Sequence, residues 1–195
     1  MAYLSASIKD QRMPARRDAL DTQLRSLLKA CQRDDRLAQQ RLFKRFYDAL
    51  LAVCLRYTPD KDTAKELVLK AFTKIFRGLP QLEDLTAFPA WAKRITVHTC
   101  LDYVRQQRNK TDLPLEEGPE PAVPASVMDK FAAEELLALV QRLPNQHRAV
   151  FSLYTLDGYS HAEIAQQLGI TPENSRWYLS SARKKLKSLI QTLER

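Results

Sequence analysis

Apolar side chains recur at intervals of three and four along the first half of the chain, a period that predicts α-helices. A short amphipathic segment begins at Asp21, and longer apolar stripes follow over residues 38–57 and 64–79. A loop at 80–87 precedes a further helical segment over 88–110, which ends in basic residues. We therefore expect these helices to pack together as a first domain.

The second half of the chain repeats this helical period after a segment of different composition. Residues 111–129 hold four of the ten prolines and five acidic residues, but no lysine or arginine. Proline and repulsion between like charges both favour an extended, exposed chain. The expected organisation is all-α, with two helical domains. Its parts are a flexible leader over 1–20, a first domain over 21–110, a linker over 111–130 and a second domain over 131–195.

A helix-turn-helix is predicted near the end of the chain. Ser160 and Glu163 stand three residues apart, which is the spacing of a capping box at a helix N-terminus. Gly169 suits the left-handed conformation that ends a helix, and Thr171 before Pro172 suits the start of the next one. Two helices joined by a short turn that contains glycine form this motif.

The second helix of the motif has a face suited to DNA. Its period turns Ser175, Leu179 and Ala182 inward, and no acidic residue occurs between Glu173 and Glu194. The opposite face is expected to carry lysine, serine and tryptophan side chains, a composition that fits a major groove. The alternative left open is an ordinary solvated basic face on a core helix.

Composition narrows the class of function. The 195 residues carry a formal net charge of +8, which favours an anionic partner, with nucleic acid first and a membrane surface second. No apolar run approaches the ~20 residues of a spanning helix, and the N-terminus lacks the apolar core of a signal peptide, so we expect a cytoplasmic protein. The three cysteines and three histidines lack metal-ligand spacing, and no catalytic or nucleotide-binding motif occurs. We expect no cofactor, no metal and no enzymatic activity.

Five segments in a fixed order carry a resemblance to a known family. They are LFKRFYDALLAVCLRY at 42–57, AKELVLKAFTKIF at 64–76, FPAWAKRITVHTCLDYVRQQR at 88–108, LPNQHRAVFSLYTLDGYSHAEIAQQLGI at 143–170 and ARKKL at 182–186. The first three resemble region 2, and the last two resemble region 4, of extracytoplasmic-function (ECF) sigma factors in the sigma-70 family. The resemblance runs from about Asp21 to Leu189 and so covers nearly the whole chain.

The resemblance implies a protein that binds core RNA polymerase and promoter DNA, with an anti-sigma factor as its regulator. Region 4 would read the −35 element in the major groove, and region 2 would hold the melted −10 element as a single strand. The implied −35 contacts are Ser160, Thr171, Asn174, Arg176, Trp177, Tyr178, Ser180, Ser181, Arg183 and Lys184. The implied −10 contacts are Trp91, Lys93, Arg94, His98, Arg105 and Arg108, and the polymerase contacts are Glu66, Leu69, Lys70 and Thr73. Trp91 has an equal claim to be a core residue, and Arg105 is expected to pair with Asp102.

Three segments of the chain depart from the family pattern. His98 stands where asparagine is usual, and the polymerase-binding run keeps Glu66 but has Lys70 in place of a second acid. Region 4 has two aromatic residues, Trp177 and Tyr178, where its usual motif has none. These departures keep a second hypothesis open, namely a degenerate sigma-like regulator that acts as a protein-interaction module without promoter recognition.

Overall fold

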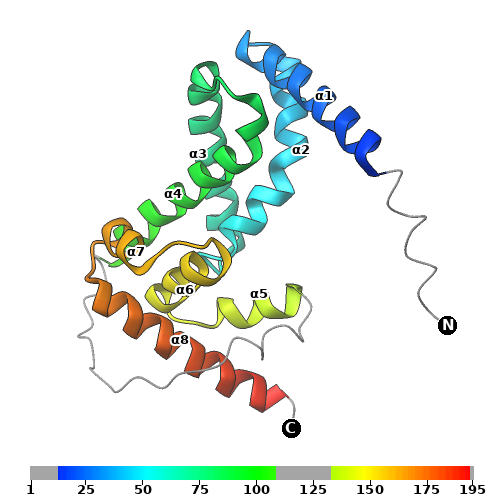
Figure 1. Ribbon diagram of the computed structural model, residues 1–195. Coiled ribbons are helices and arrows are strands. Elements are labelled where there is room, and N and C mark those ends of the chain that lie inside the picture. Colours follow the sequence, from blue (N-terminus) through cyan, green and yellow to red (C-terminus); the bar gives the residue numbers. More distant parts are fainter. Residues whose placement is uncertain (1–12, 109–132, 194–195) are drawn as a thin grey trace, which may run out of the picture.

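The computed structural model describes the backbone of residues 13–108 and 133–193, and within these ranges it is helical and has no strand (Figure 1). This confirms the all-α prediction. The elements are α1 (Met13–Gln32), α2 (Arg36–Cys54), α3 (Lys61–Gly78), the 3-10 turns η1 (Leu79–Gln81) and η2 (Leu85–Ala87), α4 (Phe88–Arg108), α5 (Ala133–Gln141), α6 (Asn145–Phe151), the π-helical turn η4 (Ser152–Leu156), α7 (His161–Leu168) and α8 (Pro172–Leu193).

Helix α1 begins earlier than the sequence pattern predicted. The expected leader was wrong over residues 13–20, because the helix starts at Met13. Pro14 suits a first helical turn, and the alanine, arginine and leucine residues that follow favour a helix even without an apolar period. Residues 1–12, 109–132 and 194–195 lie outside the described residues, so the rest of the leader and the whole linker stay predictions.

Short polar side chains fix where the helices of the first unit begin. The Asp35 carboxylate accepts hydrogen bonds from the backbone N–H groups of Leu37 and Ala38, at 2.9 and 3.0 Å. Asp60 does the same for Thr63 at the start of α3. Each carboxylate accepts hydrogen bonds from N–H groups that have no partner inside the helix. Its negative charge also interacts favourably with the positive end of the helix dipole.

The core of the first unit lies where α2, α3 and α4 meet, and α1 packs against α2. Its fully buried side chains include Leu42, Val68, Ile75, Phe88 and Leu101. These residues come from the apolar stripes of the sequence, and their burial is the main source of the unit's stability.

The second unit packs α6 and α7 against α8, with α5 at its edge. The capping box is confirmed, since Ser160 N–H donates to the Glu163 carboxylate at 2.8 Å and the Ser160 hydroxyl accepts from Glu163 N–H. Gly169 ends α7 with a φ of 63°, and the Thr171 hydroxyl accepts from Asn174 N–H at 3.1 Å. The predicted helix-turn-helix is therefore present.

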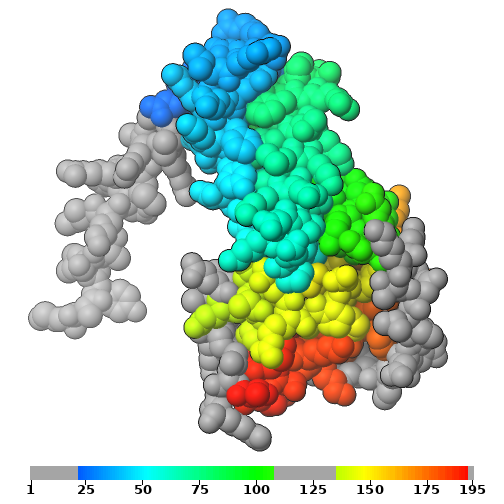
Figure 2. Space-filling view, turned by 180° about the vertical axis from the view of Figure 1, so that it is seen from behind, coloured from blue at the N-terminus to red at the C-terminus, as the bar shows by residue number. Residues whose placement is uncertain are grey.

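The two units touch each other. Helix α4 packs against α6 and α7, and residues 55–57, just after α2, also contact the second unit. Figure 2 shows the yellow surface of α5 and α6 directly below the cyan and green surface of the first unit. Within the described ranges, no helix has the length and apolarity needed to cross a lipid bilayer.

Candidate nucleic-acid interface

The outward face of α8 is basic but narrower than predicted. Arg176 and Lys184 are exposed, whereas Leu179 and Ala182 are buried as expected. The prediction that Ser180 faces outward is wrong, because it is 8% exposed. Helices α5, α6 and α7 all pack on α8, and Ser180 is among the α8 residues that are buried.

The remaining predicted −35 contacts differ in how freely they face solvent. Ser160 and Thr171 are exposed, but their hydroxyls cap α7 and α8. Arg176 lies 3.2 Å from the Glu173 carboxylate, an exposed ion pair that contributes little to stability. The half-buried members are Asn174, Trp177, Tyr178, Ser181 and Arg183.

A histidine that the sequence reasoning did not assign holds the aromatic residues of α8. His147, on α6, has its ring 5.5 Å from Trp177 and 5.0 Å from Tyr178 between centroids, and its Nε2 lies 3.1 Å from the Ser181 hydroxyl. Burial, and secondly the charge of Lys185, lowers the pKa of His147 to about 4. The ring is therefore neutral near pH 7, and it positions Trp177 and Tyr178 without adding charge.

A second aromatic contact lies at the junction of η4, α7 and α8. Tyr154 stacks on His161 with ring centroids 4.5 Å apart, and the Arg183 guanidinium sits 5.8 Å above the Tyr154 ring. His161 Nδ1 is also 2.9 Å from the Ser175 hydroxyl. The arginine is held by a cation–π contact at the edge of the outward face.

Four residues of α4 and one of α3 surround a hollow of about 290 Å³ on the first unit. It is lined by Lys74, Trp91, Arg94, Ile95 and His98. The Trp91 ring is half-buried and packs on Phe88 with centroids 6.0 Å apart, so it is neither a core residue nor a free platform. The hollow combines one aromatic wall with a cationic rim.

Gly78 is needed for the Trp91 ring to sit where it does. A Cβ atom at this position would lie 3.0 Å from Trp91 Cζ2, closer than side chains normally approach. The glycine at the end of α3 thus admits the indole at close range, which helps to shape the wall of the hollow.

The electrostatics of the hollow favour a neutral histidine. Burial lowers the pKa of His98, as does the charge of Arg94, while Asp102 opposes them. Asp102 also forms an ion pair with Lys74 at 3.0 Å and another with Arg105, which confirms the expected Asp102–Arg105 pair. A neutral imidazole offers one donor and one acceptor to a ligand.

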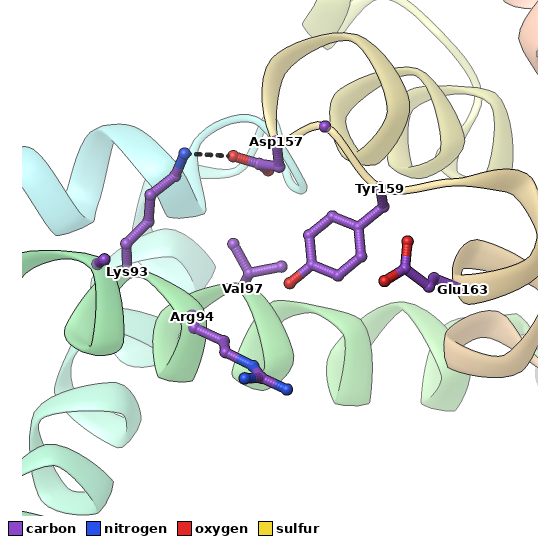
Figure 3. Close-up of a pocket in the computed structure, with 8 residues that line it drawn as sticks. Lys93, Arg94, Val97, Asp157, Tyr159 and Glu163 are labelled. Atoms are coloured by element: carbon purple, nitrogen blue, oxygen red, sulfur yellow. Dashed lines mark ion pairs between the residues drawn. The ribbon is translucent and has the colours of Figure 1, made fainter. Parts of the chain in front are cut away.

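Three of the predicted −10 residues do not line the hollow, and one of them is Arg105, the partner of Asp102. Lys93 turns toward the second unit, where its Nζ lies 2.7 Å from the Asp157 carboxylate (Figure 3). It lines a separate, open groove of about 400 Å³ that is shared by α4 and the segment 157–163. Arg108 is the last residue of α4, and its side chain lies outside the described residues.

The predicted polymerase contacts lie together on one exposed stripe of α3. The described contacts within it are an ion pair between Glu66 and Lys70 at 3.7 Å and a hydrogen bond from the Thr73 hydroxyl to the Leu69 carbonyl at 3.0 Å. Leu69 is 52% exposed, which is unusual for a leucine in the middle of a helix. Single exposed apolar residues are common on protein surfaces, so Leu69 alone does not identify a partner.

Comparison with known proteins finds matches in both units. The family description "Sigma-70 region 2" matches residues 42–110, and "Sigma-70, region 4" matches residues 133–186. The RNA polymerase sigma factor SigZ of Bacillus subtilis is 26% identical over 150 residues, which cover 77% of this chain and 85% of the relative.

Two further relatives carry the ECF description. The ECF RNA polymerase sigma factor SigM of Mycobacterium tuberculosis is 29% identical over 168 residues, covering 84% of this chain and 83% of the relative. The ECF RNA polymerase sigma-E factor of Escherichia coli K12 is 28% identical over 182 residues, which cover 87% of this chain and 95% of the relative. Among solved structures, CnrH in complex with the cytosolic domain of CnrY gives a TM-score of 0.44 at 20% identity, over 87% of this chain and 97% of the other.

Proposed function

Since the chain belongs to the sigma-70 family as an ECF member, we propose that it binds core RNA polymerase and directs it to specific promoters. The observation that carries the proposal is the pairing, in one chain, of a helix-turn-helix with a basic outer face and a unit with an aromatic, cation-rimmed hollow. The protein then acts by binding and orienting DNA, without a reaction of its own.

The second unit is the proposed reader of the −35 element. An α-helix that follows a short turn fits the major groove, where arginine, asparagine and aromatic side chains meet base edges. Arg176 and Asn174 lie in the first turns of α8, and Lys184 lies two turns further along, where it suits a phosphate contact. Trp177, braced by His147, is the member of this face with the largest apolar surface.

The hollow of the first unit is the proposed site for an unpaired base of the −10 element. An extruded base gains from stacking on an aromatic ring and from hydrogen bonds to its exposed edge, and Trp91 and His98 supply these. Arg94 is exposed at the rim and suits the adjoining phosphate. Arg105, which pairs with Asp102, and Arg108 are the proposed phosphate contacts further along α4.

The exposed stripe of α3 is the proposed contact with core polymerase. Leu69 supplies the apolar area, and the Glu66–Lys70 pair lies beside it. Polymerase is a cytoplasmic machine, and we infer that this protein works there, with an anti-sigma protein as the regulator expected for its family.

Run-off transcription on fragmented host genomic DNA, with the host's core polymerase and sequencing of the transcripts, tests this function. We expect transcripts whose 5′ ends share a two-part upstream motif and which disappear when the protein is left out. Binding to core polymerase without such transcripts would instead support the sigma-like interaction module. Absence of both would contradict membership in any working polymerase complex.

A further inference from the structure

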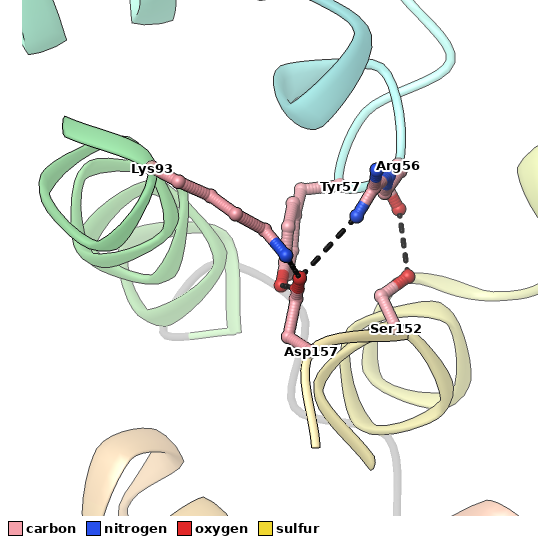
Figure 4. A network of polar contacts seen from close by, with 5 residues as sticks. All are labelled: Arg56, Tyr57, Lys93, Ser152 and Asp157. Atoms are coloured by element: carbon pink, nitrogen blue, oxygen red, sulfur yellow. Dashed lines mark hydrogen bonds and ion pairs between the residues drawn. The ribbon is translucent and has the colours of Figure 1, made fainter. Parts of the chain in front are cut away.

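The contact between the two units is centred on a buried carboxylate. Asp157, which follows η4, has a side chain only 2% exposed, and its described partners all come from the first unit. The Tyr57 hydroxyl donates to it at 2.9 Å, Lys93 Nζ lies at 2.7 Å, and Arg56 Nη1 lies at 3.3 Å (Figure 4). Burial, and then Asp157 itself, raises the pKa of Tyr57 well above its usual value, so the hydroxyl keeps its proton.

Side chains of the second unit also cap the C-terminal end of α2. Backbone carbonyls just past a helix end lack partners within the helix. Here Gln141 donates to the Leu55 carbonyl at 3.1 Å, the Ser152 hydroxyl to the Arg56 carbonyl at 3.3 Å, and Arg148 to the Tyr57 carbonyl at 3.0 Å.

Arg148 is the central member of this cap. It is 2% exposed and donates further hydrogen bonds to the carbonyls of Gln141 and Leu143 and to the Asn145 side chain. Burial lowers the pKa of Arg148 to about 10, which leaves it charged near pH 7. A cation at the negative end of α2 interacts favourably with the helix dipole, so the second unit completes the first electrostatically.

This contact occupies groups that the −10 strand needs. Lys93, a predicted phosphate contact, is instead paired with Asp157. In the groove beside it, Glu163 and Arg94 both line the wall; hydrogen bonds from Ser160 are the main cause of the lowered pKa of Glu163, and the charge of Arg94 adds a smaller contribution. The second unit therefore presents carboxylates to the basic side of α4, where phosphates would otherwise bind.

The closed arrangement is incompatible with reading both promoter elements at once. The −10 and −35 elements lie about 25 base pairs apart, which is about 85 Å along B-DNA at 3.4 Å per base pair. Two units in direct contact cannot reach both. The 24 residues from 109 to 132 span at most about 80 Å when fully extended, a reach of the right order for the units to separate on DNA.

We propose that Arg56, Tyr57 and Lys93 form a docking surface for region 4 of the same chain, and that Asp157 competes there with promoter phosphate. The free protein is held closed, and the docking surface is vacated when region 2 binds single-stranded promoter DNA. This inference rests on the proposed function, because it assigns a second role to one of its DNA-binding faces.

The test measures the affinity of the full chain for a single-stranded oligonucleotide that carries the −10 sequence found by run-off mapping. Asp157→Asn removes the negative charge with little change of shape, and we expect binding at least about threefold tighter than wild type. The matched control is Asp62→Asn, which breaks an exposed aspartate–lysine pair with Lys65 at 2.9 Å and changes the net charge equally. The control variant is expected to bind no more than marginally tighter.

A second variant guards against a folding defect in Asp157→Asn. Gln141→Ala removes only the hydrogen bond to the Leu55 carbonyl, and we expect it to tighten binding in the same direction by a smaller factor. Equal gains for Asp157→Asn and Asp62→Asn, or no gain for Asp157→Asn and Gln141→Ala, would overturn the proposal. If wild type still directs promoter-specific run-off transcripts in that case, the proposed function stands and only the docking inference falls.

Discussion

Two carboxylates, Asp102 on α4 and Asp157 in the second unit, each pair with two cations, but one is exposed to solvent and the other is buried. Asp102 pairs with Lys74 and Arg105 and has a side chain 45% exposed, whereas Asp157 pairs with Lys93 and Arg56 at 2% exposure. In water, such pairs gain little, because solvent screens them and the side chains lose freedom. Away from water, a partly broken network leaves costly unpaired groups.

The contrast separates a working surface from a structural joint. The Asp102 network lies on the proposed −10 face, where its cations can exchange the carboxylate for DNA phosphate at little cost. The Asp157 network joins the two units and is sensitive to the loss of any member. The number of ion pairs is the same in both, so burial is what assigns their different roles.

Arg148→Met is expected to have the largest effect on stability. The change removes four described hydrogen bonds and leaves buried carbonyls without donors, and we expect a loss of about 3 kcal/mol or more in the free energy of unfolding. Urea unfolding measures this. Arg142→Met, an identical change at an exposed neighbouring position, is the control and should change it by less than about 0.5 kcal/mol.

The buried histidine extends the same contrast to pH. The folded-state pKa of His147 is about 4, below the usual 6.5, so the unfolded chain binds more protons between these values. The contribution of neutral His147 to the free energy of unfolding is complete above pH 6.5. It is lost as the pH falls toward 4, and the loss is at most about 3 kcal/mol. His147→Gln should flatten the stability profile in this window, whereas His98→Gln, at a half-exposed site, should leave most of the slope in place.

Substitutions of the two carboxylates are expected to have the next largest effect on the free energy of unfolding. Asp157→Asn should cost about 2 kcal/mol of unfolding free energy, because it removes the charge of a buried carboxylate that contacts Tyr57, Lys93 and Arg56, although the two cations themselves are partly exposed. Asp102→Asn should cost under about 1 kcal/mol. Thermal melts at low and high salt check both, and equal costs for the two variants would remove burial as the deciding factor.

The smallest predicted effect concerns DNA alone. Lys184→Ala should weaken binding to −35 duplexes of any sequence about equally and lower the salt slope by roughly one unit, as loss of one phosphate contact does. Lys44→Ala, an exposed lysine on α2, should leave the slope unchanged. The same slope in all three proteins would remove Lys184 from the DNA face.

Local features of this chain could be predicted from its sequence, and distant ones could not. The Ser160–Glu163 box and Gly169 depend on neighbours within a few residues, and the structure confirms them. Asp157 and Arg148 depend on partners in the other unit, such as Arg56, 101 residues from Asp157, and Tyr57, 91 residues from Arg148, and no periodicity indicates such contacts. Ser180 was misplaced for the same reason, since its burial depends on the helices packed against α8 rather than on the period of its own helix.

The central claim is that the free protein is closed and opens on promoter DNA. Spin labels at Lys61→Cys and Lys187→Cys, two exposed positions in different units, allow the distance between them to be measured by pulsed electron resonance. The native thiols Cys31, Cys54 and Cys100 are buried, which favours labelling at the new sites. The account predicts one narrow distance distribution in the free protein and a longer one in the complex with core polymerase and promoter. A broad distribution in the free protein, or the same distances in both states, would contradict it.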